Sequence, residues 1–163
     1  MTVFCLASAF STKTVQTKQN DYLLFNKAGR CEEAMEFYLQ ATGGQLLQKM
    51  TFGDMPEQGE QIGDQSAPPL PPEKIMHAHL RIGQGELMMS DGNPDQPPAS
   101  EHAGYAVSLA TTDAEQGKAW FEKLSAGGKV TTPWQKTFWS DGFAMFIDKF
   151  NIPWRINVVK SDE

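Results

Sequence analysis

The chain has 163 residues, 40% of them hydrophobic, which is enough to build one ordinary domain around a packed core. Its 20 Asp and Glu against 14 Lys and Arg give a formal charge of −6, and the basic residues form no cluster. This excludes nucleic acid and anionic membrane surfaces as expected partners, since both are bound by basic patches. No apolar stretch approaches the roughly 20 residues that a membrane helix needs. Cys5 and Cys31 are too few for a disulfide framework and lack metal-ligand spacing, so both are expected to be thiols in a reducing compartment.

Residues 1–20 are expected to be an extension that precedes the folded domain. They begin with a short apolar run that ends in an Ala-x-Ala pattern, but they lack the basic start and the apolar length of a signal peptide. A polar stretch without periodicity follows. A cytoplasmic location is therefore expected.

From residue 21 the pattern predicts a strand, a helix and three strands. Tyr22–Phe25 is typical of a strand, and Arg30–Thr42 places apolar residues three and four apart, as in a helix that buries one face. Gly43-Gly44 is expected to end this helix. The three later strands are expected at Gln45–Phe52, Ile75–Ile82 and Glu86–Asp91, the last two joined by the tight turn Gly83-Gln84-Gly85.

The same order of elements then returns. A strand is expected at Tyr105–Ala110, followed by a helix that Thr112-Asp-Ala-Glu115 opens as a capping box and Gly127-Gly128 ends. Three strands are expected near residues 129–137, 143–148 and 154–159. The sequence therefore predicts one α+β domain over residues 21–159, built from two βαβββ modules. The modules cover residues 21–91 and 104–159, a Pro-rich linker covers 92–103, and residues 160–163 form a tail.

Several segments resemble proteins of the vicinal oxygen chelate superfamily, which includes glyoxalases, bleomycin-resistance proteins and dioxygenases. The matching segments are Glu33–Tyr38, Met76–Ile82, Leu87–Asp91, Trp134–Trp139, Asp148–Phe150 and Pro153-Trp154. They are most similar to its PhnB-like, 3-demethylubiquinone 3-methyltransferase-like branch. The resemblance implies two curved mixed sheets with the helices outside and a ligand pocket in the concavity.

Metal-dependent members of this superfamily place one ligand on the first and one on the last strand of each module. The resemblance puts these four positions near Leu23, Met89, Tyr105 and Arg155, none of which is a good ligand for a hard cation. A metal is therefore not expected at the usual site, and no motif for another cofactor is recognised. A methyltransferase would need a cofactor-binding α/β sheet that this order of elements lacks.

His77 and His79 are expected on one face of a strand, because side chains alternate along it. Met76, Ala78, Leu80 and Ile82 would form the opposite, apolar face and pack under a helix. The pair could give two ligands to a metal, but the sequence places no Glu, Asp or Cys nearby as a third. The alternative is a pair of hydrogen-bonded polar residues on a half-buried strand.

Arg155 and Asn157 alternate with apolar residues in the same way, so they are expected to face the same concavity as His77 and His79. Such a pocket would suit a small polar or anionic molecule, and nearby aromatic residues would give a stacking surface. The aromatic residues in question are Tyr105, Trp134, Phe138 and Trp139. The alternative is that these aromatics belong to the core and that Arg155 pairs with a structural carboxylate such as Asp148.

Two functions from different classes remain open. The first is a metal-free protein that binds or sequesters a small molecule. The second is a glyoxalase-like or dioxygenase-like enzyme with an atypical or absent metal, in which His77 or His79 acts as general base. A homodimer is expected in either case, with the acidic, Pro-rich segment 53–73 as an arm that reaches the second copy.

Overall fold

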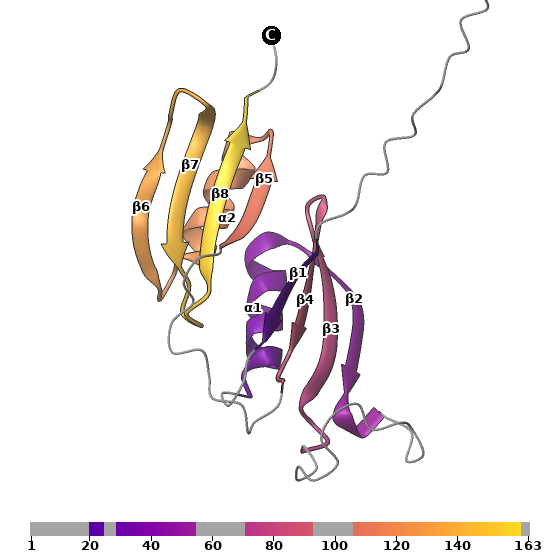
Figure 1. The fold of residues 1–163 in the computed structure, drawn as a ribbon. Helices are drawn as coiled ribbons and strands as arrows, with labels where there is room; N and C mark the ends of the chain where they lie inside the picture. The colour runs from indigo at the N-terminus through magenta and orange to yellow at the C-terminus, as the bar shows by residue number, and fades with distance from the viewer. Residues whose placement is uncertain (1–19, 25–28, 55–70, 93–105, 161–163) are drawn as a thin grey trace, which may run out of the picture.

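A computed structural model describes residues 20–24, 29–54, 71–92 and 106–160, with side chains from residue 29 onward. The first module contains β1 (Asn20–Leu24), α1 (Cys31–Thr42), β2 (Gln45–Thr51), β3 (Ile75–Ile82) and β4 (Gly85–Ser90), with a short 3-10 turn at Phe52–Asp54. The second contains β5 (Val107–Thr111), α2 (Ala114–Leu124), β6 (Lys129–Gln135), β7 (Ser140–Ile147) and β8 (Pro153–Val159). The predicted order βαβββ is confirmed in both halves (Figure 1).

Each module forms one four-stranded mixed sheet. The strand orders are β1-β4-β3-β2 and β5-β8-β7-β6, so the two sheets have the same topology. In each, the first strand runs parallel to the last, and the other neighbours are antiparallel. The predicted α+β fold is thereby confirmed.

The two sheets also share the register of their buried faces. Ala78 pairs with Met89 in the first module, and Ala144 pairs with Ile156 in the second; all four side chains are fully buried. Next to these pairs, larger apolar partners meet, Leu80 with Leu87 and Phe146 with Trp154. The internal repeat therefore extends to the arrangement of the core. Because the registers agree, each residue on the sheet face turned away from the helix can be matched to a counterpart in the other module.

One helix packs on each sheet, and the two helices contact each other. The buried face of α1 consists of the five residues that the spacing predicts: Cys31, Ala34, Met35, Tyr38 and Ala41. α2 buries Trp120 and Leu124, and the Trp120 Nε1 donates to the Thr42 carbonyl at the end of α1, at 3.1 Å. The buried residues of both modules form one continuous core.

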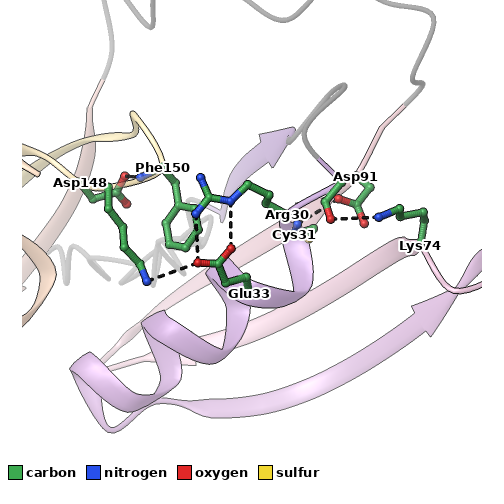
Figure 2. Close-up of polar contacts among 9 residues, drawn as sticks. Arg30, Cys31, Glu33, Lys74, Asp91, Asp148 and Phe150 are labelled. Carbon is green, nitrogen blue, oxygen red and sulfur yellow. Dashed lines mark hydrogen bonds and ion pairs between the residues drawn. The ribbon is translucent and has the colours of Figure 1, made fainter. Parts of the chain in front are cut away.

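The two helices begin differently. α2 is capped by Asp113, whose carboxylate accepts from the backbone N–H groups of Glu115 and Gln116; the predicted cap, Thr112, is therefore wrong by one residue. α1 has no local side-chain cap. Instead Asp91, just beyond β4, accepts from the Cys31 N–H at 3.0 Å (Figure 2). The same carboxylate accepts from the Ile75 N–H at 2.9 Å. Burial, followed by the charge of Asp91, raises the pKa of the Cys31 thiol.

Asp148 joins the modules at the turn between β7 and β8. Its buried carboxylate accepts from the N–H groups of Phe150 and Ile152, from Trp154 Nε1 at 2.8 Å, and from the Tyr38 hydroxyl on α1 at 2.6 Å. Burial and this carboxylate raise the pKa of Tyr38. The alternative pairing of Asp148 with Arg155 is therefore wrong, because its oxygens serve the turn and α1.

A second set of contacts covers this junction at the surface. Arg30 forms a bidentate ion pair with Glu33, at 2.9 and 3.0 Å, and lies over the ring of Phe150 (Figure 2). Lys149 lies over the rings of Phe37 and Phe150 and also approaches Glu33. These exposed contacts add cation–π attraction to the buried bonds of Asp148.

Candidate functional site

The chemistry-bearing residues lie on the two sheet faces that are turned away from the helices. Along β3, Ala78, Leu80 and Ile82 are buried, whereas His77, His79 and Arg81 alternate with them on the other face. Along β8, Trp154, Ile156 and Val158 are buried, and Arg155 and Asn157 alternate with them. We call these two surfaces the first and the second open face.

On the first open face, His79 belongs to a small charged cluster. Its Nε2 lies 3.2 Å from Glu86 Oε2, and the Arg81 guanidinium reaches Glu86 Oε1 at 3.1 Å. The rings of His77 and His79 have centroids 6.2 Å apart. The expectation that no carboxylate lies near these histidines is therefore wrong. The tight turn at residues 83–85 folds β4 back along β3, which places Glu86 across from Arg81.

The described residues hold no group of three His, Cys, Asp or Glu side chains arranged to bind a metal ion. Besides Glu86, the residues paired with the two histidines on the neighbouring strands offer two thioethers and one amide. Met50 is the cross-strand partner of His77, and Gln48 and Met88 are those of His79.

On the second open face, Arg155 projects from β8 and is held by a hydroxyl rather than by a carboxylate. Its Nε and one terminal nitrogen donate to Ser108 Oγ on β5, at 3.4 and 3.2 Å. Two residues further along β8, Asn157 stands between Phe143 of β7 and Ala110 of β5 in the ladder. The Trp139 ring packs on Phe143 with centroids 5.8 Å apart, and Phe138 packs on Trp139.

The predicted aromatic residues separate into two groups. Phe138 and Trp139 remain exposed, at 88% and 49%, beside the second open face. Trp134 lies on the other side of the same sheet: its ring stacks on Phe121 of α2 with centroids 6.0 Å apart and sits where Gly117 and Gly142 leave room. The prediction that Trp134 lines the pocket with Arg155 is therefore wrong. Tyr105 lies outside the described residues.

The shared register revises the positions at which relatives would place metal ligands. Met89 is buried on the helix side, so the counterpart of Arg155 in the first module is Met88. The first-strand partners in the ladder are Tyr22 for Met88 and Ser108 for Arg155, in place of Leu23 and Tyr105. The revised set of Tyr22, Met88, Ser108 and Arg155 contains no imidazole and no carboxylate.

His77 and His79 lie on a different sheet from Arg155 and Asn157. A cavity between the modules touches both open faces, with Glu86 on one side and Ser108 on the other, but its volume is about 60 Å³. Ligand pockets usually measure ~300–1,000 Å³. This cavity is therefore too small to be the shared pocket that the sequence predicts for these four residues.

Exposed large apolar side chains gather on the sheets. Among the described residues, they all come from β2, β6, β7, β8 or the β6–β7 connection: Leu46, Leu47, Val130, Phe138, Trp139, Met145 and Val159. Apolar surface of this kind commonly marks a site for a ligand or a partner. Met145 lies on the second open face, with Phe138 and Trp139 beside it, whereas Leu46 and Val130 pair with the buried Leu80 and Phe146 and lie on the helix side of their sheets.

Comparison with known proteins agrees with this architecture. A family model described as "Glyoxalase/Bleomycin resistance protein/Dioxygenase superfamily" matches residues 27–156. The protein YjdN of Escherichia coli K12 is 40% identical over 141 residues, which are 85% of this chain and 93% of YjdN. The crystal structure of PA1353 from Pseudomonas aeruginosa has a TM-score of 0.71 at 34% identity and covers 89% of this chain and 99% of that one.

A more distant structure, a PhnB protein from Bacillus cereus, has a TM-score of 0.64 at 21% identity, with 86% of this chain and 98% of that chain covered. The chain belongs to the glyoxalase/bleomycin resistance protein/dioxygenase superfamily, also called the vicinal oxygen chelate superfamily. Within the part of the chain that is described, no helix has the length and apolar character to cross a membrane.

Proposed function

We propose that this protein binds a small molecule without a metal ion, and that the second open face is its ligand surface. The observation that carries the proposal is Arg155. It occupies the last-strand position at which metal-dependent relatives hold a ligand, and a guanidinium there repels a cation while offering several N–H donors to an anion. Ser108 holds the guanidinium without neutralising it.

We further propose that a second copy of the chain closes the site. The cavity of about 60 Å³ between the modules is too small for a ligand, and the exposed side chains of Met145 and Trp139 at the second open face need cover. A partner that covers the second open face would close the site around Arg155 and Asn157. The sequence motifs also lead us to propose membership of the PhnB-like branch.

Two measurements on freshly purified, full-length protein test metal-free binding. Native mass spectrometry is expected to detect a retained small molecule, and elemental analysis is expected to find no stoichiometric zinc, nickel, iron or manganese. One equivalent of such a metal per chain, lost when His77 and His79 are changed to Ala, would contradict the proposal. The double variant Gln48→Ala with Arg81→Gln is the matched control, because it changes two other polar residues of the same face.

Light scattering tests the dimer. The intact chain is expected to have twice its monomer mass at micromolar concentration; a monomeric mass defeats the proposal. A version with residues 56–72 shortened tests whether that segment acts as the arm. The backbone bonds from Gly53 N–H to the Pro72 carbonyl and from Phe52 N–H to the Lys74 carbonyl close the base of this segment, so it can be shortened without separating β2 from β3.

An enzyme is the second candidate, and the contact between His79 and Glu86 favours it. A carboxylate that orients an imidazole prepares it to accept a proton. Incubation of the retained molecule with excess protein decides between the two: conversion that His79→Gln abolishes would establish the enzyme, whereas recovery of the molecule unchanged supports binding alone.

A further inference from the structure

We infer that the ligand is a flat, conjugated anion that carries a hydroxyl group at its end opposite the anionic group. This inference rests on the proposed function, since it assigns a chemical class to the molecule that the second open face would bind. Four features of that face carry it: an unpaired amide oxygen, an aromatic wall, a guanidinium without a carboxylate, and the spacing of the two polar residues along β8.

The unpaired oxygen belongs to Asn157. Among the described residues, two buried side-chain polar atoms lack a hydrogen-bond partner: Asn157 Oδ1 and Thr137 Oγ1. Asn157 stands on the second open face, and Thr137 precedes Phe138 and Trp139 in the β6–β7 connection. An unpaired buried polar atom costs roughly 1–3 kcal/mol, so a ligand that donates to Asn157 is favoured over one that cannot. A hydroxyl suits this amide in either orientation of its oxygen and nitrogen, since it both donates and accepts.

The aromatic wall borders the same residue. Phe143 is the cross-strand neighbour of Asn157 on β7, and the ring of Trp139 packs on Phe143 from the chain segment before β7. Nearly half of the Trp139 surface is exposed, so the indole still has area that a ring can cover. Rings of this kind bind flat conjugated groups by offset or edge-to-face contacts.

The anionic end is assigned by Arg155. Its only polar contact among the described residues is with the Ser108 hydroxyl, which leaves most of its N–H donors available. A planar guanidinium binds a carboxylate through two parallel hydrogen bonds. On the first open face, by contrast, the Arg81 guanidinium already forms an ion pair with Glu86, so it is a weaker site for an anion.

The spacing sets the length of the ligand. Arg155 and Asn157 are two residues apart on one face of β8, which separates their Cα atoms by about 7 Å along the strand. A carboxylate and a hydroxyl at opposite ends of one or two fused rings span a comparable length. We therefore take 6-hydroxy-2-naphthoate as the probe.

The test compares this probe with three relatives, each of which lacks one feature. 2-Naphthoate lacks the hydroxyl, 2-naphthol lacks the carboxylate, and trans-4-hydroxycyclohexanecarboxylate lacks the flat ring. Calorimetric titration of the full chain is expected to give an affinity for the probe about tenfold above that for each relative, which corresponds to ~1.4 kcal/mol.

Variants then assign each feature to its residue. Asn157→Ala is expected to remove the advantage of 6-hydroxy-2-naphthoate over 2-naphthoate, and Arg155→Gln that of 6-hydroxy-2-naphthoate over 2-naphthol. Gln48→Ala and Arg81→Gln, the matched changes on the first open face, are expected to leave both ratios unchanged. Ratios that survive the Asn157 and Arg155 variants, or equal affinity for the cyclohexane compound, overturn the assigned class.

Failure of this inference differs from failure of the proposed function. If none of the four compounds binds saturably while native mass spectrometry shows a retained molecule of another class, the assigned class is wrong and the binding function stands. If no compound binds and no molecule is retained, both are overturned.

Discussion

The two modules are alike on the sheet faces that pack against the helices and differ on their open faces. Ala78 with Met89 and Ala144 with Ile156 occupy matching ladder positions under matching helices. On the open faces, the register places His79 where the second module has Met145, and Met88 where it has Arg155. The residues that face the helices maintain the fold through packing, and those on the open faces are free to differ in chemistry. A fold shared between modules therefore does not imply a shared site, even within one chain.

The modules also differ in how they secure their helices. Asp113 caps α2 from the adjacent residue, whereas Asp91 caps α1 from sixty residues away and holds the start of β3 at the same time. In addition, α1 is tied to the second module through Tyr38 and Asp148. The start of the first helix thus depends on a long-range polar contact, whereas the start of the second helix is capped locally.

The largest effect is expected at Asp148. Asp148→Ala leaves four donors without their acceptor, three of them near the β7–β8 turn and one on α1, and should lower the free energy of unfolding by about 4 kcal/mol or more. Urea denaturation measures it. Tyr38→Phe, which removes only the α1 donor, is the control and should cost about 1 kcal/mol. Equal costs for the two variants would show that the turn does not depend on this carboxylate.

The next largest loss of stability is expected at the glycine pairs that follow the two helices. A Cβ on Gly128 would lie 2.1 Å from the Ile147 carbonyl oxygen, and a Cβ on Gly44 would lie 2.7 Å from that of Arg81. Both Ala variants should be destabilising, Gly128→Ala by about 3 kcal/mol and Gly44→Ala by less, because backbone must move in each case. Thermal or urea unfolding shows which variant loses more stability. A larger loss for Gly44→Ala than for Gly128→Ala would contradict the closer approach in the second module.

Removal of the helix caps is expected to cause the next largest loss of stability. Asp91→Ala should lower the free energy of unfolding by about 2–3 kcal/mol, since it leaves two buried N–H groups without an acceptor. Asp113→Ala, at an exposed cap, should cost about 1 kcal/mol. The two unfolding free energies are measured under the same conditions. A cost for Asp113→Ala as large as that for Asp91→Ala would remove the distinction between a long-range and a local cap.

The smallest effect on stability is expected at Arg155, where ligand binding should respond instead. Arg155→Lys should change the free energy of unfolding by less than about 0.5 kcal/mol, because the side chain is exposed. It should weaken binding of 6-hydroxy-2-naphthoate about tenfold, since an ammonium cannot reproduce the planar fork. Arg81→Lys is the matched control. Unchanged binding by Arg155→Lys would make Arg155 structural.

The sequence predicted the fold well because its evidence is local. The three-and-four spacing of α1, the glycines after each helix and the alternation along β3 and β8 each depend on neighbouring residues. The placement of His77, His79, Arg155 and Asn157 on open faces followed from the same alternation.

The site was predicted less well because its contacts depend on strand register and packing. Glu86 meets His79 only once β4 pairs with β3, and Ser108 meets Arg155 only once β5 pairs with β8. Trp134 turned to the helix side because the β6–β7 ladder has register shifts that interrupt simple alternation, and two glycines make room for its ring. The tight turn before Glu86 was the one local feature that could have revealed its partner.

Amide chemical-shift mapping tests most directly whether the second module carries the ligand. In ¹H–¹⁵N spectra of the full-length protein titrated with 6-hydroxy-2-naphthoate, we expect the largest shifts along β5, β7 and β8, centred on Ser108, Phe143 and Asn157. The same titration of Arg155→Gln should lose these shifts while the rest of the spectrum stays in place. Largest shifts along β3 and β4, around His77, His79 and Glu86, would contradict the assignment and move the site to the first module.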